Sequence, residues 1–198
     1  MARDLVNAIQ QSGCGVDARV RATGHTLFFA LWPEDAVRAQ MEVRTKALDR
    51  QHHPHGRLLK PERYHLTLQF LGGHTDIPPQ LVEDAMSVAG RVRTPAFDLS
   101  LDQAGSFQKV WWLGSAQPPA GLEALWQALD ADPMHAWVKG VSPDGFIAHV
   151  TVVRDATTRL PPTPISPIVW RVRGFVLIDS QPPRPYAILH RWRLQDAE

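Results

Sequence analysis

The 198-residue sequence has a single cysteine, a formal net charge of only +1 and no long hydrophobic run. One cysteine excludes an internal disulfide framework. No apolar stretch approaches the roughly 20 residues of a membrane-spanning helix, and no apolar segment typical of a secretory signal follows the N-terminus. The low net charge excludes attraction of nucleic acid by the whole surface, so such contacts must come from a local patch. We therefore expect a cytoplasmic globular protein.

The sequence also lacks the motifs of several large enzyme classes. It contains no P-loop, no G-x-G-x-x-G and no G-x-S-x-G, the signatures of nucleoside triphosphate binding, dinucleotide binding and serine hydrolysis. The cluster His52-His53-Pro54-His55 has no acidic or cysteine partner at the spacing of a metal site, which favours a polar loop. We expect no metal and no cofactor.

Two short segments each carry a His and a Thr two residues apart within an apolar run, Tyr64–Leu68 and Ala148–Val152. Alternate residues of a strand point to the same face, so each His shares a face with its Thr. A buried sheet has no reason to carry this polar pair twice. The repeated pair suits a reaction that needs a proton donor, a proton acceptor and two hydroxyl groups. The alternative is two unrelated strand histidines, each satisfied by its own surroundings.

The order of elements predicts an α+β fold built on antiparallel sheets. Residues 1–24 are expected to be an appended segment with a short helix around residues 4–11, and residues 25–198 to form one domain. Because a similar order of elements leads to each motif, we expect two related halves that place the two His across a cleft. The proline-rich stretch 160–167 is expected to be a loop. The predicted helices are 34–48, 80–91 and 121–131, and the predicted strands outside the motifs are 26–32, 97–105, 109–114, 170–180 and 186–194.

The residues around both motifs resemble the 2H phosphoesterase superfamily and, within it, the RNA 2′,3′-cyclic phosphodiesterases, also described as 2′-5′ RNA ligases. The resemblance covers residues 25–195 and is strongest at residues 61–72 and 146–154. Two departures are an unusual N-terminal extension and Ala148, where a Pro often precedes the second His; neither removes a catalytic atom. The resemblance implies a bilobal fold, with a pseudo-two-fold pair of antiparallel sheets flanked by helices and an active-site groove between the lobes.

The resemblance also implies metal-independent hydrolysis of RNA 2′,3′-cyclic phosphate ends to 2′-phosphomonoesters, and a reverse 2′-5′ ligation that needs no ATP. It makes His65 the proton donor and His149 the proton acceptor, an assignment that the two similar motifs do not decide by themselves. Imidazole suits both tasks because its pKa lies near neutrality. The hydroxyls of Thr67 and Thr151 suit the phosphoryl oxygens. The expected partners are RNA ends or nucleoside 2′,3′-cyclic phosphates, and no obligate protein partner is evident.

Four further residues are candidates for substrate binding. Arg154 suits the phosphate, but strict alternation places it opposite His149, so a bulge or the end of the strand must redirect it. A surface salt bridge is its alternative role. Phe28, Phe29 and Tyr186 suit stacking on a base, although packing in the core is the alternative for the two phenylalanines.

Two other functions fit the same residues. The site could act on another cyclic phosphate, such as ADP-ribose 1″,2″-cyclic phosphate, or on a 2′-5′ oligoadenylate. Alternatively, the chain could be a non-catalytic module that binds RNA ends. A comparison of kcat/KM over a panel of substrates would distinguish the first alternative from action on RNA 2′,3′-cyclic phosphates. Tight binding of RNA ends with negligible turnover would indicate the second.

Overall fold

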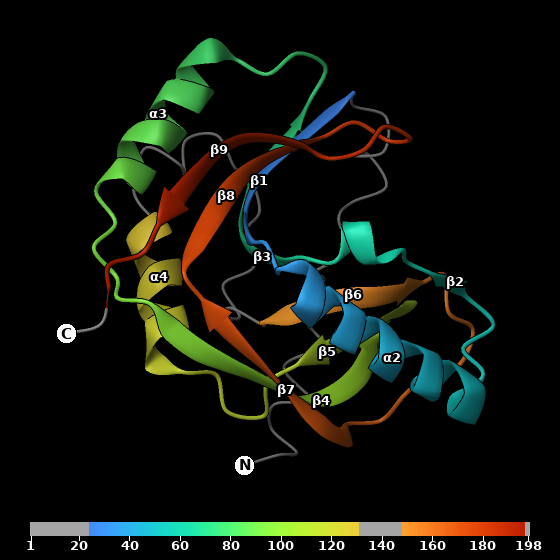
Figure 1. Ribbon diagram of the computed structural model, residues 1–198. Coiled ribbons are helices and arrows are strands. Elements are labelled where there is room, and N and C mark those ends of the chain that lie inside the picture. Colours follow the sequence, from blue (N-terminus) through green and yellow to red (C-terminus); the bar gives the residue numbers. More distant parts are fainter. Residues whose placement is uncertain (1–23, 131–147, 197–198) are drawn as a thin grey trace.

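Figure 1 shows the computed structural model, which describes residues 24–130 and 148–196. The helix expected around residues 4–11 and Cys14 lie outside these ranges. The helices are α2 (Asp35–His52), η2 (Pro61–Arg63, a 3-10 turn), α3 (Pro79–Gly90) and α4 (Ala120–Leu129). The strands are β1 (His25–Leu31), β2 (Arg57–Leu58), β3 (Leu66–His74), β4 (Phe97–Phe107), β5 (Val110–Gly114), β6 (His149–Arg154), β7 (Thr163–Val172), β8 (Gly174–Ser180) and β9 (Ala187–Arg193).

The strands form one antiparallel sheet in the order β7-β4-β5-β6-β3-β1-β8-β9, with β2 paired to β6. The two strands that carry the His–Thr motifs, β3 and β6, are neighbours at the centre. Each is followed outward by three strands, so the halves β3-β1-β8-β9 and β6-β5-β4-β7 repeat the same arrangement. The α+β class and the antiparallel pairing are therefore as predicted.

The expectation of two separate sheets is corrected by the pairing of β3 with β6. These strands share the antiparallel pair Leu66–Val150, which joins the two halves into one continuous sheet. Both residues are fully buried. The junction is this one pair, so the two halves remain distinguishable within the sheet. The groove implied between the lobes stays a prediction.

The proline-rich stretch 160–167, expected to be a loop, is a loop only as far as residue 162, and residues 163–167 belong to β7. Pro164 pairs with Gln103, and the register with β4 shifts by two residues before Ile168 pairs with Leu101. Prolines are tolerated here because β7 is an edge strand and because a bulge interrupts the ladder. The single strand expected at 170–180 is also wrong: β7 ends at Val172 and β8 begins at Gly174, in the other half of the sheet. A Cβ at Gly174 would collide with the carbonyl oxygen of Trp192.

The helices cover one face of this sheet. Helix α2 packs against β7 of one half, and α4 packs against β3 and β4, with α3 beside α4 (Figure 1). The core between helices and sheet includes Met41, Leu81 and Leu125 from the helices and Leu27 and Val150 from the strands. We call this the helix-covered face. None of the described helices is both long and apolar enough to cross a membrane.

Candidate active site

The four residues of the two motifs lie on the face of the sheet opposite the helices. His65, Thr67, His149 and Thr151 are each partly exposed, whereas the residues between them are buried in the helix-packed core. His149 is the first residue of β6, and His65 immediately precedes β3. Extended backbone therefore separates the polar from the apolar side chains, as the sequence predicts. We call this surface the His–Thr face.

The Leu66–Val150 pair sets the relation between the two motifs. In an antiparallel ladder, the residue before one partner lies opposite the residue after the other. Continued by one residue in each direction, this register places His65 opposite Thr151 and Thr67 opposite His149. Each His thus lies opposite the Thr of the other motif, and His149 is close enough to His65 for its charge to lower the pKa of that imidazole.

A bulge follows the Thr in both motifs. On β3, Thr67 and Gln69 pair with the adjacent residues Ala30 and Phe29, so Leu68 is an extra residue. On β6, Thr151 and Val153 pair with Trp112 and Trp111, so the extra residue is Val152. In each bulge two consecutive residues are buried, and alternation resumes with inverted parity.

The bulge on β6 brings Arg154 to the His–Thr face. Without it, Arg154 would point to the helix-covered face; with it, Arg154 is partly exposed and close enough to His65 to affect the pKa of that imidazole. The redirection that the sequence requires for Arg154 is therefore present. At the equivalent position of β3 the chain has Phe70, which packs with Phe28. The two halves thus differ in charge at matching positions.

The His65 imidazole has one nitrogen committed to the backbone. Its Nδ1 lies 2.8 Å from the carbonyl oxygen of Arg63. A carbonyl only accepts hydrogen bonds, so Nδ1 carries a hydrogen and Nε2 is the atom available to a ligand. Burial, helped by the positive charges of Arg154, His149 and Arg38, lowers the pKa of His65 to about 4, against the opposing effect of the hydrogen bond to the Arg63 carbonyl. At neutral pH the ring is therefore neutral in the free protein.

Two arginines hold the η2 turn, which ends two residues before His65. Arg38 of α2 is buried, and its Nε and Nη1 each donate a 2.7 Å hydrogen bond, to the carbonyls of Pro33 and Pro61. On the outer side, Arg63 donates a 2.6 Å hydrogen bond to the carbonyl of Arg184, and its guanidinium lies 4.4 Å from the centre of the Tyr186 ring. The position of the His65 imidazole thus depends on both contacts.

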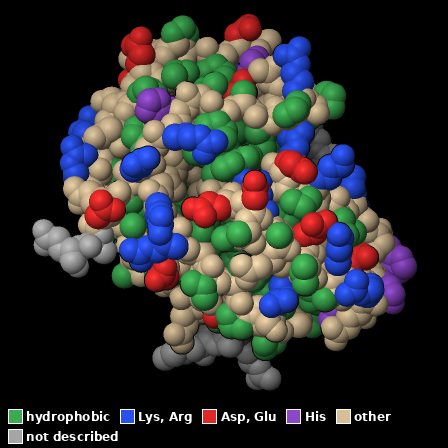
Figure 2. All heavy atoms as spheres, viewed as in Figure 1, with side chains coloured by type: hydrophobic (Ala, Val, Ile, Leu, Met, Phe, Trp, Pro, Cys, Tyr) green, Lys and Arg blue, Asp and Glu red, His purple; other side chains and the backbone are tan. Residues whose placement is uncertain are grey.

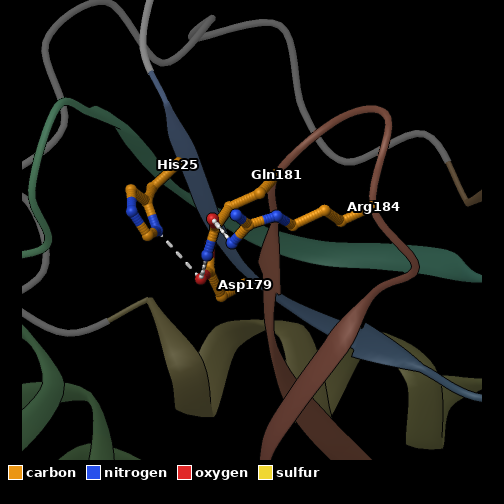
Figure 3. A network of polar contacts seen from close by, with 4 residues as sticks. All are labelled: His25, Asp179, Gln181 and Arg184. Atoms are coloured by element: carbon orange, nitrogen blue, oxygen red, sulfur yellow. Dashed lines mark hydrogen bonds and ion pairs between the residues drawn. The ribbon is translucent and has the colours of Figure 1, made fainter.

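The loop between β8 and β9, which leads to Tyr186, is tied to the body of the sheet by a polar network (Figure 3). Asp179 at the end of β8 accepts a 2.9 Å hydrogen bond from Nδ1 of His25 and a 2.7 Å hydrogen bond from Gln181. Arg184 in turn donates a 3.1 Å hydrogen bond to the side-chain oxygen of Gln181. The network limits how far the loop, and with it the Tyr186 ring, can move.

Two of the three aromatic candidates lie beside His65 and one does not. The ring centres of Phe28 and Tyr186 are 5.1 and 5.2 Å from that of His65. Phe29 is fully buried in the helix-covered core, where it packs against Phe175. Its expected role in substrate binding is therefore corrected, because adjacent residues of β1 point to opposite faces. Trp32, which the sequence did not single out, extends the aromatic row and lies 6.1 Å from Tyr186.

The His149 side has its own aromatic support, and Phe107 is the part of it that sequence reasoning missed. The Phe107 ring meets His149 edge-on at 4.9 Å and stacks on Trp112 at 6.5 Å. Its position at the end of β4, beside the turn to β5, gives no local signal of contact with a residue 42 positions away. Only the β4–β5–β6 pairing brings the three rings together.

Charged side chains are unevenly distributed over the face of the molecule that Figure 2 shows. Figure 2 shows lysine and arginine side chains over β8 and β9 and near β2, with acidic side chains between them, over the start of α2 and around η2. Within residues 24–130 and 148–196, no group of three or more His, Cys, Asp or Glu side chains is arranged to hold a metal ion. The two imidazoles, two hydroxyls and one guanidinium are suited to proton transfer at a phosphate ester.

Comparisons with known proteins point to one family. The profile of the 2′-5′ RNA ligase superfamily matches residues 32–181. An RNA 2′,3′-cyclic phosphodiesterase from Escherichia coli (strain K12) is 34% identical over 145 residues, which are 70% of this chain and 80% of that relative.

Solved structures agree with this similarity. The crystal structure of E. coli LigT complexed with 3′-AMP superposes with a TM-score of 0.70 at 33% identity, covering 87% of this chain and 99% of that one. The complex of E. coli LigT with ATP gives a TM-score of 0.68 at 34% identity, with the same coverage.

Proposed function

The chain belongs to the 2′-5′ RNA ligase superfamily, and from this membership we propose that it hydrolyses RNA 2′,3′-cyclic phosphate ends to 2′-phosphomonoesters. The observation that carries the proposal is the cluster of two imidazoles and two hydroxyls on the His–Thr face, set by the Leu66–Val150 register. A five-membered cyclic diester needs one proton removed from water and one delivered to the leaving ribose oxygen. Two histidines supply both.

In the proposed reaction, His149 takes a proton from the attacking water as the new P–O bond forms. His65 gives a proton from Nε2 to the 3′-oxygen as the P–O3′ bond breaks, which leaves the phosphate on the 2′-oxygen. In the free protein His65 is neutral at pH 7, because burial and nearby positive charges lower its pKa. The anionic phosphate opposes this effect, so His65 gains its proton as the substrate binds.

The remaining residues of the cluster stabilise the phosphate. Thr67 and Thr151 donate hydrogen bonds from their hydroxyls to the phosphoryl oxygens, on which charge develops in the transition state. Arg154 supplies a positive charge from the same face of β6. Phe28 and Tyr186 border His65 and provide apolar surface for the terminal nucleoside. The ligand lies in the groove between the two halves.

The same site can open the cyclic phosphate with a 5′-hydroxyl in place of water. A 5′-hydroxyl that occupies the position of water attacks the cyclic phosphate, the P–O3′ bond breaks, and a 2′-5′ linkage remains. The strain of the cyclic diester drives this step, so no ATP is required.

The product of uridine 2′,3′-cyclic phosphate hydrolysis tests the proposal. We expect the 2′-phosphomonoester, identified by ³¹P NMR. The variants His65→Asn and His149→Asn should each lose about 10²- to 10⁴-fold in kcat/KM, the usual contribution of a general acid or base. His55→Asn is the matched control, because His55 is exposed and has a positive φ of 49° that Asn tolerates.

Three outcomes would contradict the proposal. A 3′-phosphomonoester would mean that the leaving oxygen is misassigned. Wild-type turnover by both His variants would remove the two-histidine mechanism. Tight binding of RNA ends without turnover would indicate a binding module.

A further inference from the structure

Two arginines lie directly opposite each other at the end of β6. The short strand β2 pairs with β6 so that Arg57 is the partner of Arg154 and Leu58 is the partner of Val153. Leu58 packs against the helix-covered core, so Arg57, the residue before it, lies on the His–Thr face beside Arg154. Like charges at directly opposed positions of an antiparallel pair repel each other. The proposed reaction uses Arg154 but gives no role to Arg57.

The backbone on both sides of Arg57 fixes this pairing. A Cβ on Gly56 would lie 2.7 Å from the carbonyl oxygen of Arg154, so a larger residue would push β2 away from β6. Two residues beyond Arg57, the amide of Leu59 donates a 2.8 Å hydrogen bond to the carbonyl of Val152. The two arginines are therefore held side by side by the backbone of the two strands.

Little negative charge balances these two guanidiniums. Nε of Arg57 lies 4.0 Å from a carboxylate oxygen of Asp155, which is the outer limit of an ion pair, and the two side chains are 64% and 63% exposed. An ion pair between side chains this exposed is weak. Among the ion pairs formed within residues 24–130 and 148–196, none involves Arg154. The pair therefore suits an anionic ligand, because negative charge would remove the repulsion between the two guanidiniums.

The arginine pair lies at the His65 end of the His–Thr face. His149, Thr151 and Arg154 follow one another along β6. The register with β3 puts His65 opposite Thr151, so Arg154 and Arg57 lie beyond His65, at the end away from His149. In the proposed reaction the 3′-oxygen leaves at His65 and water is activated at His149. The ribose of the terminal nucleotide is therefore on the side of the two arginines.

We propose that Arg57 binds the phosphate on the 5′-oxygen of the terminal ribose, while Arg154 serves the reacting cyclic phosphate. In an RNA strand the 5′-phosphate is the link to the preceding nucleotide. A guanidinium donates paired hydrogen bonds to phosphate oxygens, which suits both contacts. The role of Arg57 rests on the proposed function for its substrate, and it makes the end of an oligonucleotide a better ligand than a nucleoside that carries only the reacting phosphate.

Two non-reactive dinucleotides that differ only in the charge of their linkage test this contact without requiring turnover. Both are UpU ending in a 2′-phosphomonoester, one with the natural phosphodiester link and one with an uncharged methylphosphonate link, and Kd is measured by calorimetry on the full chain. We expect the charged dinucleotide to bind about threefold to tenfold more tightly, the effect of one charge-assisted contact that is open to water. The salt dependence of its affinity should also be steeper, by roughly 0.7 in the slope of log K against log salt concentration, because one more phosphate is neutralised.

Three variants assign the preference to Arg57. Arg57→Gln should bring the ratio of the two affinities to about one and remove the difference in salt dependence. Asp155→Asn should increase the ratio, because the carboxylate competes with the phosphate for Arg57, and Asn tolerates the positive φ of 58° at this position. The matched control Arg159→Gln changes another exposed arginine and should keep the wild-type ratio.

Equal affinities of the two dinucleotides for the wild-type protein would overturn the contact, as would a preference for the charged dinucleotide that survives Arg57→Gln. Uridine 2′,3′-cyclic phosphate has no 5′-phosphate, and its hydrolysis by the wild-type protein is measured separately. Failure of the contact at Arg57 is therefore distinguishable from failure of the proposed function.

Discussion

Leu66 and Val150 pair across the centre of the sheet, and this buried pair determines how the two His–Thr motifs meet. Their side chains lie in the helix-covered core, so the neighbouring residues on both strands point to the opposite face. A shift of the pairing by one residue would place the His and Thr side chains in the core. The proposed chemistry therefore depends on this strand register as much as on the four polar residues.

The opposed positions of His and Thr predict coupling between the motifs. Thr67→Val and Thr151→Val keep the shape of the side chain but remove the hydroxyl, and each should lower kcat/KM by about 10- to 10³-fold through the loss of one oxyanion donor. Thr→Ser at either position should retain most of the activity, because Ser keeps the donor.

A double-mutant cycle checks this coupling. Thr151→Val combined with His65→Asn should cost less in kcat/KM than the product of the two single effects, because the residues act on the same phosphate. Purely multiplicative losses would contradict a shared cluster. Thr157→Val, an exposed residue beyond β6, is the control and should leave kcat/KM unchanged.

Burial of His65 predicts an unusual titration. Its pKa should be about 4 in the free protein, below the ordinary value of 6.5. Inorganic phosphate in the site favours the imidazolium, so saturating phosphate should raise the pKa of His65. NMR of ¹³C-labelled histidine across a pH series measures both values, and the spectrum of His65→Asn assigns the resonance. A pKa near 6.5 in the free protein, or no response to phosphate, would contradict the described environment.

The local pattern of the sequence was enough to predict that the two His–Thr motifs share a polar face. Strand parity placed each His and its Thr on the same face, and the position of Arg154 predicted that a bulge or the end of the strand redirects it. The edge position of β7 was not predictable, because the pairing of Pro164 depends on which strand ends the sheet. Phe107 reaches His149 only through long-range pairing, and Phe29 is distinguished from Phe28 only by which face of β1 the helices cover.

The bulge at Val152 predicts that Arg154 acts on the phosphate. Arg154→Met removes the charge while keeping much of the length of the side chain, and kcat/KM should fall by about 10²-fold or more. The pKa of His65 should rise in the same variant, because Arg154 is one of the charges that lower it.

The two measurements on Arg154→Met, kcat/KM and the pKa of His65, distinguish a charge in the active site from a surface salt bridge. Arg159→Met is the matched control, since Arg159 is an exposed arginine a few residues further along the chain. It should change neither quantity. Stable folding of Arg154→Met with unchanged kcat/KM would assign Arg154 to the surface role.

Gly105 is packed so closely that we expect a single added methyl group to disturb the aromatic rings beside His149. Gly105 pairs with Trp112, and a Cβ there would lie 2.5 Å from Cζ2 of the Trp112 ring. Gly105→Ala should therefore displace the ring, lower the free energy of unfolding by about 1–3 kcal/mol as overpacking does, and reduce turnover through Phe107 and His149. Urea unfolding measures the first effect. Gly90→Ala, at a site with no atom within 4 Å, is the control and should cost nothing. In the background Trp112→Leu the cost of Gly105→Ala should shrink, and an equal cost in both backgrounds would show that the ring is not what the methyl group meets.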